Sequence, residues 1–115
     1  YKQSWDSILE QIKAINPNAT IVATEFYNPY YNLEELGGIS EYYIKQLNDI
    51  LHDKNNTAYY IANIYEVFNN PEEKCTNVNT DSLNYNRFNI SSFDPHPNAH
   101  GHKIIAEKII ESLQK

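Results

Sequence analysis

The stretch TIVATEF, residues 20–26, decides the fold class of this chain. Its residues are mostly β-branched or apolar, and the run is too short for a typical helix, so it predicts a buried strand. Asn16, Pro17 and Asn18 come just before it and predict the end of a preceding helix. A second run of the same kind, AYYIANI at residues 58–64, predicts a second strand.

Three amphipathic helices are expected around these strands. The first is expected to use Ser4 as its N-cap and to carry one apolar stripe, formed by Trp5, Ile8, Leu9, Ile12 and Ile15. The second is expected from about Ser40, and its stripe consists of Tyr43, Ile44, Leu47, Ile50 and Leu51. The last has Gly101 in its first turn, and its predicted buried side consists of Ile105, Ala106, Ile109, Ile110 and Leu113. Residues 69–92 are expected to form a long polar connection.

The elements are therefore expected in the order α-β-α-β-α. Strands that are joined through helices pair in parallel by right-handed crossovers, with helices on both faces of the sheet. Two parallel strands alone leave backbone groups unpaired at both edges. We therefore interpret residues 1–115 as one α/β domain that forms the C-terminal part of a doubly wound fold, and we expect its remaining strands upstream of Tyr1.

Composition excludes several classes of function. The formal net charge is −6, which argues against a nucleic-acid partner, because phosphate binding needs a basic face. No apolar run approaches the roughly 20 residues of a membrane-spanning helix, so no transmembrane segment is expected. Cys75 is the only cysteine, so the chain forms no internal disulfide.

His96 is the strongest candidate for a catalytic residue. It stands between Pro95 and Pro97, directly before the last predicted helix, where the helix dipole favours a neutral imidazole that can act as a base. Asp94 precedes a proline and should be extended, which places its carboxylate on the same side as the His96 ring and could orient that ring. The alternative is an Asx-type turn at Asp94 with a solvated His96 that merely starts the helix.

A metal site is a weaker interpretation of the histidines. His96, His100 and His102 lie close in sequence, but His100 and His102 would point about 200° apart on a helix. No glutamate or cysteine nearby completes a tetrahedral set of ligands. The sequence therefore predicts neither a metal site nor another cofactor.

At residues 94–106, the segment DPHPNAHGHKIIA resembles the last conserved block of the SGNH, or GDSL-type, serine hydrolases. In that block a histidine, followed by Pro-Asn and a nearby glycine, precedes the final helix. The segment NPNATIVATEFYNPYY, residues 16–31, is similar to the family's fourth strand with its following Tyr-Asn-Pro turn, as in the lysophospholipase-like branch. YYIANIYEVFN, residues 59–69, resembles the next strand, although relatives often have aspartate where Asn63 stands here.

The resemblance implies a three-layer α/β/α, flavodoxin-like domain that cleaves esters through a Ser-His-Asp arrangement. His96 would be the general base and Asp94 its orienting acid. In the family the aspartate usually stands three residues before the histidine, a position that Phe93 occupies here, so a backbone carbonyl is the alternative orienting group. The family's Gly-Asp-Ser block is absent from this chain, and the serines present, Ser4, Ser7, Ser40, Ser82, Ser91, Ser92 and Ser112, have no such context.

The turn after the first strand is the expected substrate-binding segment. In open parallel sheets ligands bind beyond the carboxyl ends of the strands, which is where Tyr27, Asn28 and Tyr30 should lie. Their rings and amide could line an acyl or sugar site. An equally weighted alternative is that these tyrosines are turn residues that pack their rings on the surface.

Two classes of function follow from these observations. The first is an esterase or acylhydrolase that acts on a small ester, either a lipid or an acylated carbohydrate, with its serine outside this chain. The second is a non-catalytic binding module on the same α/β scaffold, which the missing nucleophile favours; a metal-dependent hydrolase is a third and weaker alternative. We expect the chain by itself to be inactive, and to self-associate or to pair with the strands that it lacks.

Overall fold

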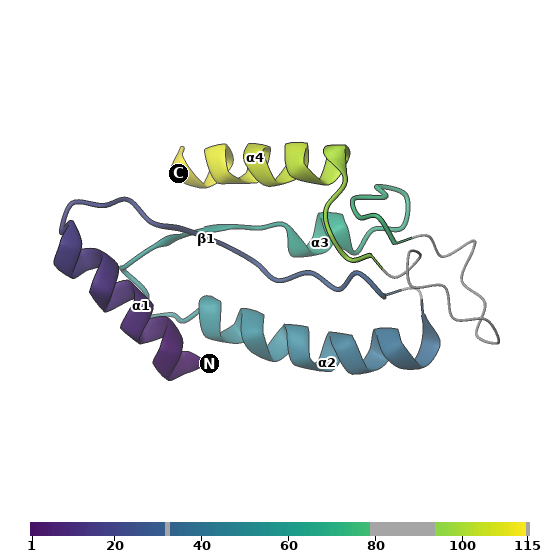
Figure 1. The fold of residues 1–115 in the computed structure, drawn as a ribbon, viewed down its shortest axis with the longest axis horizontal. Helices are drawn as coiled ribbons and strands as arrows, with labels where there is room; N and C mark the ends of the chain where they lie inside the picture. Colours follow the sequence, from purple (N-terminus) through teal and green to yellow (C-terminus); the bar gives the residue numbers. More distant parts are fainter. Residues whose placement is uncertain (32, 79–93, 115) are drawn as a thin grey trace.

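A computed structural model describes residues 1–31, 33–78 and 94–114 of this protein (Figure 1). The described elements are α1 (Lys2–Ile15), β1 (Val22–Thr24), α2 (Glu34–Leu51), β2 (Tyr60–Ala62), α3 (Tyr65–Phe68) and α4 (Ala99–Leu113). The predicted α/β class is confirmed, and so is the predicted order of the longer elements. The one-turn helix α3, directly after β2, is an addition that the sequence pattern does not predict. Among these helices none is long and apolar enough to cross a membrane.

The two strands pair in parallel, as predicted. Val22 stands opposite Tyr60, Ala23 opposite Ile61 and Thr24 opposite Ala62. Both strands are shorter than predicted, and beyond β1 a side-chain amide binds the backbone. The Phe26 N–H donates to Asn48 Oδ1 at 2.8 Å, and Asn48 Nδ2 donates to the Phe26 carbonyl at 2.9 Å.

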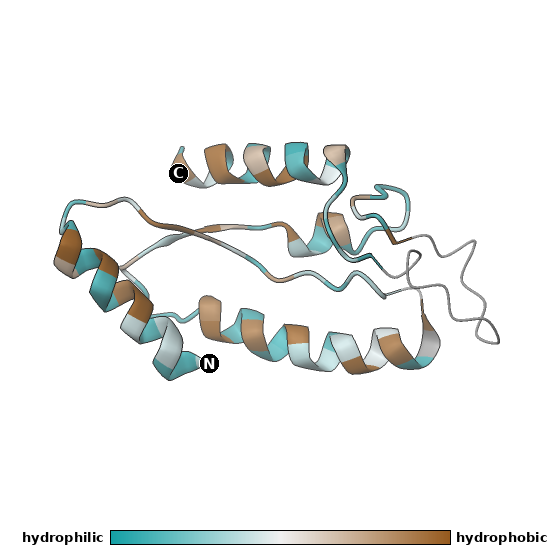
Figure 2. Ribbon diagram, viewed as in Figure 1, coloured by the Kyte–Doolittle hydropathy of each residue, from teal (hydrophilic) through white to brown (hydrophobic). Residues whose placement is uncertain are grey.

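Helices lie on both sides of the strand pair. Figure 1 shows α4 above the strands, and α1 and α2 below them. Since α2 connects β1 to β2 from below, the β1-α2-β2 unit forms the expected crossover between parallel strands. The hydropathy colouring places apolar segments on each of these helices (Figure 2).

Two predicted helix starts are wrong. Helix α1 begins at Lys2 with Tyr1 as its N-cap, and Ser4 lies inside the helix. Lys2 pairs with Asp6 at 3.0 Å, an (i, i+4) contact that stabilises this first turn. The N-cap prediction failed because a serine near a helix start caps only when the residues before it are not themselves helical.

Helix α2 begins at Glu34 rather than near Ser40. Gly37 disfavours a helix by propensity, but its N–H donates to the Leu33 carbonyl at 2.7 Å and so continues the first turn. A Cβ on Gly37 would lie 2.4 Å from the Tyr30 carbonyl oxygen, so only glycine permits this close contact between α2 and the preceding turn. Tertiary packing therefore overrides local propensity here.

The core lies between α4 and the segment that follows β2. Ile64, Phe68 and Cys75 are buried together, and Tyr27, Val67, Ile104 and Ile105 pack against them. Helix α1 has no buried residue, and Ile15 of its predicted apolar stripe is 87% exposed. On α4 the predicted buried side is also wrong in part, because Ile110 and Leu113 are about half exposed. The apolar stripes of α1 and α4 thus extend beyond the surface that two strands can cover.

Candidate functional site

His96 lies in the loop that leads into α4. The predicted helix with Gly101 in its first turn is confirmed, since Asn98 is its N-cap and Ala99 its first residue. Asn98 Oδ1 accepts a hydrogen bond from the Gly101 N–H at 2.8 Å, which satisfies one of the free donors of the first turn. His96 is therefore outside the helix, on the short segment before its positive end.

Asp94 contacts His96 in two ways at once. One carboxylate oxygen, Oδ1, accepts a hydrogen bond from the His96 backbone N–H at 3.0 Å, which is the Asx-type turn. The same oxygen also contacts Nδ1 of the His96 ring. The turn and the ring contact, which the sequence presented as alternatives, are therefore both present. When the ring is neutral, the contact favours the tautomer with the proton on Nδ1 and the lone pair on Nε2, because a carboxylate can only accept.

The hydrogen bonds to Asp94 keep its carboxylate ionised. The His96 backbone N–H, and next the His96 ring, hold the pKa of Asp94 below its ordinary value of 3.8, and Asn77 lowers that pKa further. A depressed pKa in the folded state means that these contacts stabilise the fold above the ordinary pKa of the carboxyl group. That contribution is lost as the pH falls through the lowered pKa.

Backbone pairing with residues 75–77 supports the loop that carries this pair. The Asn77 N–H donates to the His96 carbonyl at 3.0 Å, and the Asn98 N–H donates to the Cys75 carbonyl at 2.9 Å. Thr76 and Pro97 form an antiparallel bridge between these bonds. Asn77 also donates from Nδ2 to Asp94 Oδ2 at 3.3 Å, so it contacts both members of the pair.

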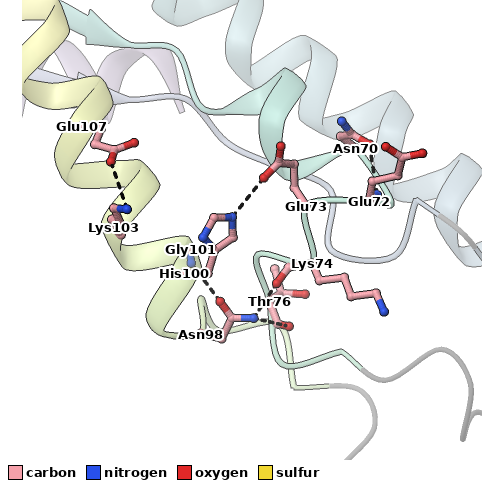
Figure 3. A network of polar contacts seen from close by, with 10 residues as sticks. All are labelled: Asn70, Glu72, Glu73, Lys74, Thr76, Asn98, His100, Gly101, Lys103 and Glu107. Carbon is pink, nitrogen blue, oxygen red and sulfur yellow. Dashed lines mark hydrogen bonds and ion pairs between the residues drawn. The ribbon is translucent and has the colours of Figure 1, made fainter.

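Further polar contacts join the N-terminus of α4 to residues 73–76 (Figure 3). Asn98 Nδ2 donates to the Lys74 carbonyl at 2.6 Å and to the Thr76 carbonyl at 3.2 Å. His100 Nε2 lies 3.0 Å from Glu73 Oε2, so this histidine contacts the segment before Cys75 and not Asp94. His102 is exposed on α4.

The tight contact of Gly101 with Cys75 gives a stability prediction. A Cβ at Gly101 would lie 2.1 Å from the Cys75 carbonyl oxygen, so Gly101→Ala should lower the free energy of unfolding by about 1–3 kcal/mol. Gly38 is the matched control, because it is also helical but a Cβ there would meet nothing within 4 Å. Gly38→Ala should therefore stabilise by about 0.5–1 kcal/mol. Thermal unfolding followed by circular dichroism measures both, and equal effects would contradict the packing argument.

Tyr27 and Tyr30 lie near the Asp94–His96 pair. Tyr27 Oη donates to the Pro95 carbonyl at 2.8 Å, and its ring packs on Phe68 with centroids 4.4 Å apart. Burial raises the pKa of both phenols, and the charge of Asp94 raises both further. The structure therefore brings together four of the five residues that the sequence selected.

Asn28 has a different place from the one predicted. It is completely buried, and its Nδ2 donates to the Gly37 carbonyl at 2.9 Å and to Glu41 Oε2 at 3.0 Å. Its Oδ1 accepts from the Tyr30 N–H at 3.0 Å. The amide of Asn28 thus makes hydrogen bonds that stabilise the turn. It lies between the turn and the start of α2 and satisfies backbone groups of both.

His96 itself is on an open surface. Its side chain is 81% exposed. A cavity of about 630 Å³ lies beside the loop, but it is lined by Tyr27, Pro29 and Pro95 rather than by His96. The His96 ring therefore lies on the surface and outside this cavity.

The serines of the described residues lie in helices, away from the loop that carries His96. Ser4 and Ser7 lie in α1, Ser40 in α2 and Ser112 in α4, where the Ser112 hydroxyl donates to the Ile109 carbonyl. The residues Ser82, Ser91, Ser92 and Phe93, and most of the predicted connection at 69–92, lie outside the described residues.

Sequence reasoning missed Asn77 and the supporting role of Tyr27. Asn77 is one of many asparagines in a polar stretch, and nothing local distinguishes it. It contacts Asp94, which lies 17 residues away, and the periodic spacing of apolar residues does not predict a contact of this kind. Comparison of the chain with protein-family models, with curated proteins and with solved structures finds no match.

Proposed function

We propose that this chain is the C-terminal part of a GDSL-type, or SGNH-type, serine ester hydrolase with a three-layer, flavodoxin-like α/β domain. In this proposal His96 is the general base and Asp94 orients it, while the serine lies outside this chain. The substrate is a small carboxylic ester, from either a lipid or an acylated carbohydrate. No metal or other cofactor takes part in the proposed reaction.

The contact between Asp94 and His96 Nδ1 carries the proposal. A serine hydrolase needs its base in one tautomer, with the far nitrogen free to take the proton from the hydroxyl. The contact supplies that tautomer, and Nε2 belongs to a side chain that is 81% exposed, so a nucleophile from another segment could approach it. The ionised Asp94 would also stabilise the imidazolium that forms during acylation.

Tyr27 and Tyr30 have supporting roles in this proposal. Tyr27 binds the Pro95 carbonyl and so helps to position the loop, and both rings lie on the same end of the parallel strands as the base. Their half-buried rings offer an apolar surface with a polar tip, which suits an acyl chain or a sugar ring. Asn28 supports the turn that presents them.

The tautomer of His96 can be measured on the chain by itself. With the imidazole neutral, ¹⁵N nuclear magnetic resonance should show the proton on Nδ1 of His96, because the carboxylate accepts only there. In Asp94→Ala the preference should disappear, and the ring should give the mixed signal of a free imidazole. A proton on Nε2 in the unmodified chain would contradict the assignment of His96 as base.

A binding module on the same scaffold is the competing function. The absence of a Gly-Asp-Ser block from this chain favours it. The two functions differ in one measurement on a longer polypeptide that contains these residues. An enzyme hydrolyses a short-chain aryl ester with turnover that depends on His96, whereas a module binds an acylated ligand and leaves it intact.

A further inference from the structure

The carboxylate of Asp94 has a partner on each of its two oxygens. Oδ1 accepts from the His96 backbone N–H at 3.0 Å and contacts Nδ1 of the His96 ring. Oδ2 accepts from Nδ2 of Asn77 at 3.3 Å, and among the described residues Asn77 is the only donor to that oxygen. The plane of a carboxylate turns over a broad range about its last side-chain bond, so contacts to both oxygens restrict it more than contacts to one.

The backbone of Asn77 is itself held beside the loop of the base. Its N–H donates to the His96 carbonyl at 3.0 Å, and the neighbouring Thr76 forms an antiparallel bridge with Pro97. These contacts place Asn77 next to the loop without any help from its side chain. Since the backbone is already ordered, only the side-chain torsions lose freedom when the amide binds Asp94.

The amide of Asn77 is a neutral donor, which preserves the charge of Asp94. A lysine or an arginine at position 77 would form an ion pair with the carboxylate and compete with the His96 ring for it. An amide donates without adding a positive charge, so the negative charge of Asp94 remains available to the ring. The His96 backbone N–H lowers the pKa of Asp94 most, and the bond from Asn77 lowers it further.

The phenols near Asp94 do not obscure the effect of Asn77. Burial, and next the charge of Asp94, raises the pKa of Tyr27 and that of Tyr30 above the ordinary value of 10.0. Both phenols are therefore neutral over the acid range in which a carboxyl group titrates. A change in the titration of Asp94 on substitution of Asn77 thus reports the loss of the Asn77 contact.

We propose that Asn77 is a positioning residue for the base, because it holds Oδ2 of Asp94 so that Oδ1 stays on Nδ1 of His96. The inference rests on the proposed function in one respect, namely the role of His96 as base. The arrangement itself belongs to this chain and can be measured without ester hydrolysis. The orientation of the base then depends on a residue that stands 17 positions before Asp94 in the sequence.

Carbon-13 nuclear magnetic resonance of the Asp94 carboxyl group, recorded as the pH is lowered, tests the proposal on the chain by itself. In Asn77→Ala the pKa of Asp94 should rise because one donor to the charged form is lost, but it should stay below 3.8 because the His96 contacts remain. In Asn77→Asp it should rise further, because a second carboxylate beside Oδ2 disfavours the charged form. Asn70→Ala is the matched control, since the Asn70 side chain binds the Glu72 N–H at 3.1 Å rather than Asp94, and it should titrate like the original chain.

The tautomer of His96 is a second measurement, which serves if the acid titration unfolds the chain. At a pH where the ring is neutral, Asn77→Ala should lower the ratio of the Nδ1–H to the Nε2–H tautomer by about threefold. The midpoint of thermal unfolding should change little, because Asn77 is exposed.

Two results overturn the proposal. One is an Asn77→Ala chain with the Asp94 titration and the His96 tautomer ratio of the original chain. The other is an Asp94 that titrates at the ordinary value of 3.8 in both Asn77→Ala and Asn77→Asp, which a loosened loop would give. A longer polypeptide that hydrolyses no ester would count against the proposed function alone, because both measurements are made on this chain.

Discussion

The 115-residue chain by itself is expected to hydrolyse no ester above background, although it carries the proposed base. In the proposed function the serine and the oxyanion donors lie outside this chain, so Nε2 of His96 would have nothing to deprotonate and the oxyanion of the transition state would find no donors. In a comparable triad, loss of the nucleophile alone lowers kcat by about 10⁶, nearly as much as loss of the whole triad. Addition of the missing portion, either fused upstream or as a separate fragment, should restore cleavage of a short-chain aryl ester.

In that restored enzyme His96→Ala should abolish the activity, again by about 10⁶ in kcat. His100→Ala and His102→Ala are the controls, because His100 contacts Glu73 rather than Asp94 and His102 is exposed on α4. Both should keep most of the activity. Ester hydrolysis by the chain alone, or a full rate in the His96→Ala enzyme, would show that His96 is not the base.

Asp94→Asn should lower kcat of the restored enzyme by about 10⁴ while the unfolding midpoint changes little. An asparagine can keep the Asx-type bond to the His96 N–H, but its amide no longer selects the tautomer with the proton on Nδ1. The measurements are kcat and the midpoint of thermal unfolding. A residue that positions the base lowers kcat and leaves the midpoint nearly unchanged, whereas a structural residue lowers both.

Asp53→Asn is the matched control for this substitution. Asp53 forms the same kind of turn, with Oδ1 accepting from the Asn55 N–H at 2.9 Å, but in the segment between α2 and β2. It should leave kcat unchanged. An unchanged rate in Asp94→Asn as well would indicate that a backbone carbonyl, and not Asp94, orients the ring.

The parts of the fold that could be predicted are those with local signals. Pro97 and the capping asparagine specify the start of α4 within a few residues, and the β-branched runs specify both strands. The Asp94–His96 contact was also predictable, because Pro95 between the two residues and Pro97 after them restrict the backbone over this two-residue spacing. Each of these depends on neighbours in sequence.

The parts that could not be predicted depend on distant segments. Helix α2 starts early because Gly37 packs on the Tyr30 carbonyl, and Asn28 is buried because α2 supplies Glu41 to it. The apolar stripes of α1 and α4 were recognised, but periodicity reports only that a face is apolar and not whether anything covers it. Exposure of Ile15 and Ile110 is therefore visible only in the structure.

Asn98 makes three kinds of contact through its side chain and its backbone. Its carbonyl oxygen caps α4, its amide binds Lys74 and Thr76, and its backbone N–H binds Cys75. The first turn of α4 and the loop of His96 consequently cannot open independently, because either opening breaks bonds of the same residue. They form one cooperative unit of local unfolding, so the proposed base is displaced only when the helix start frays with it.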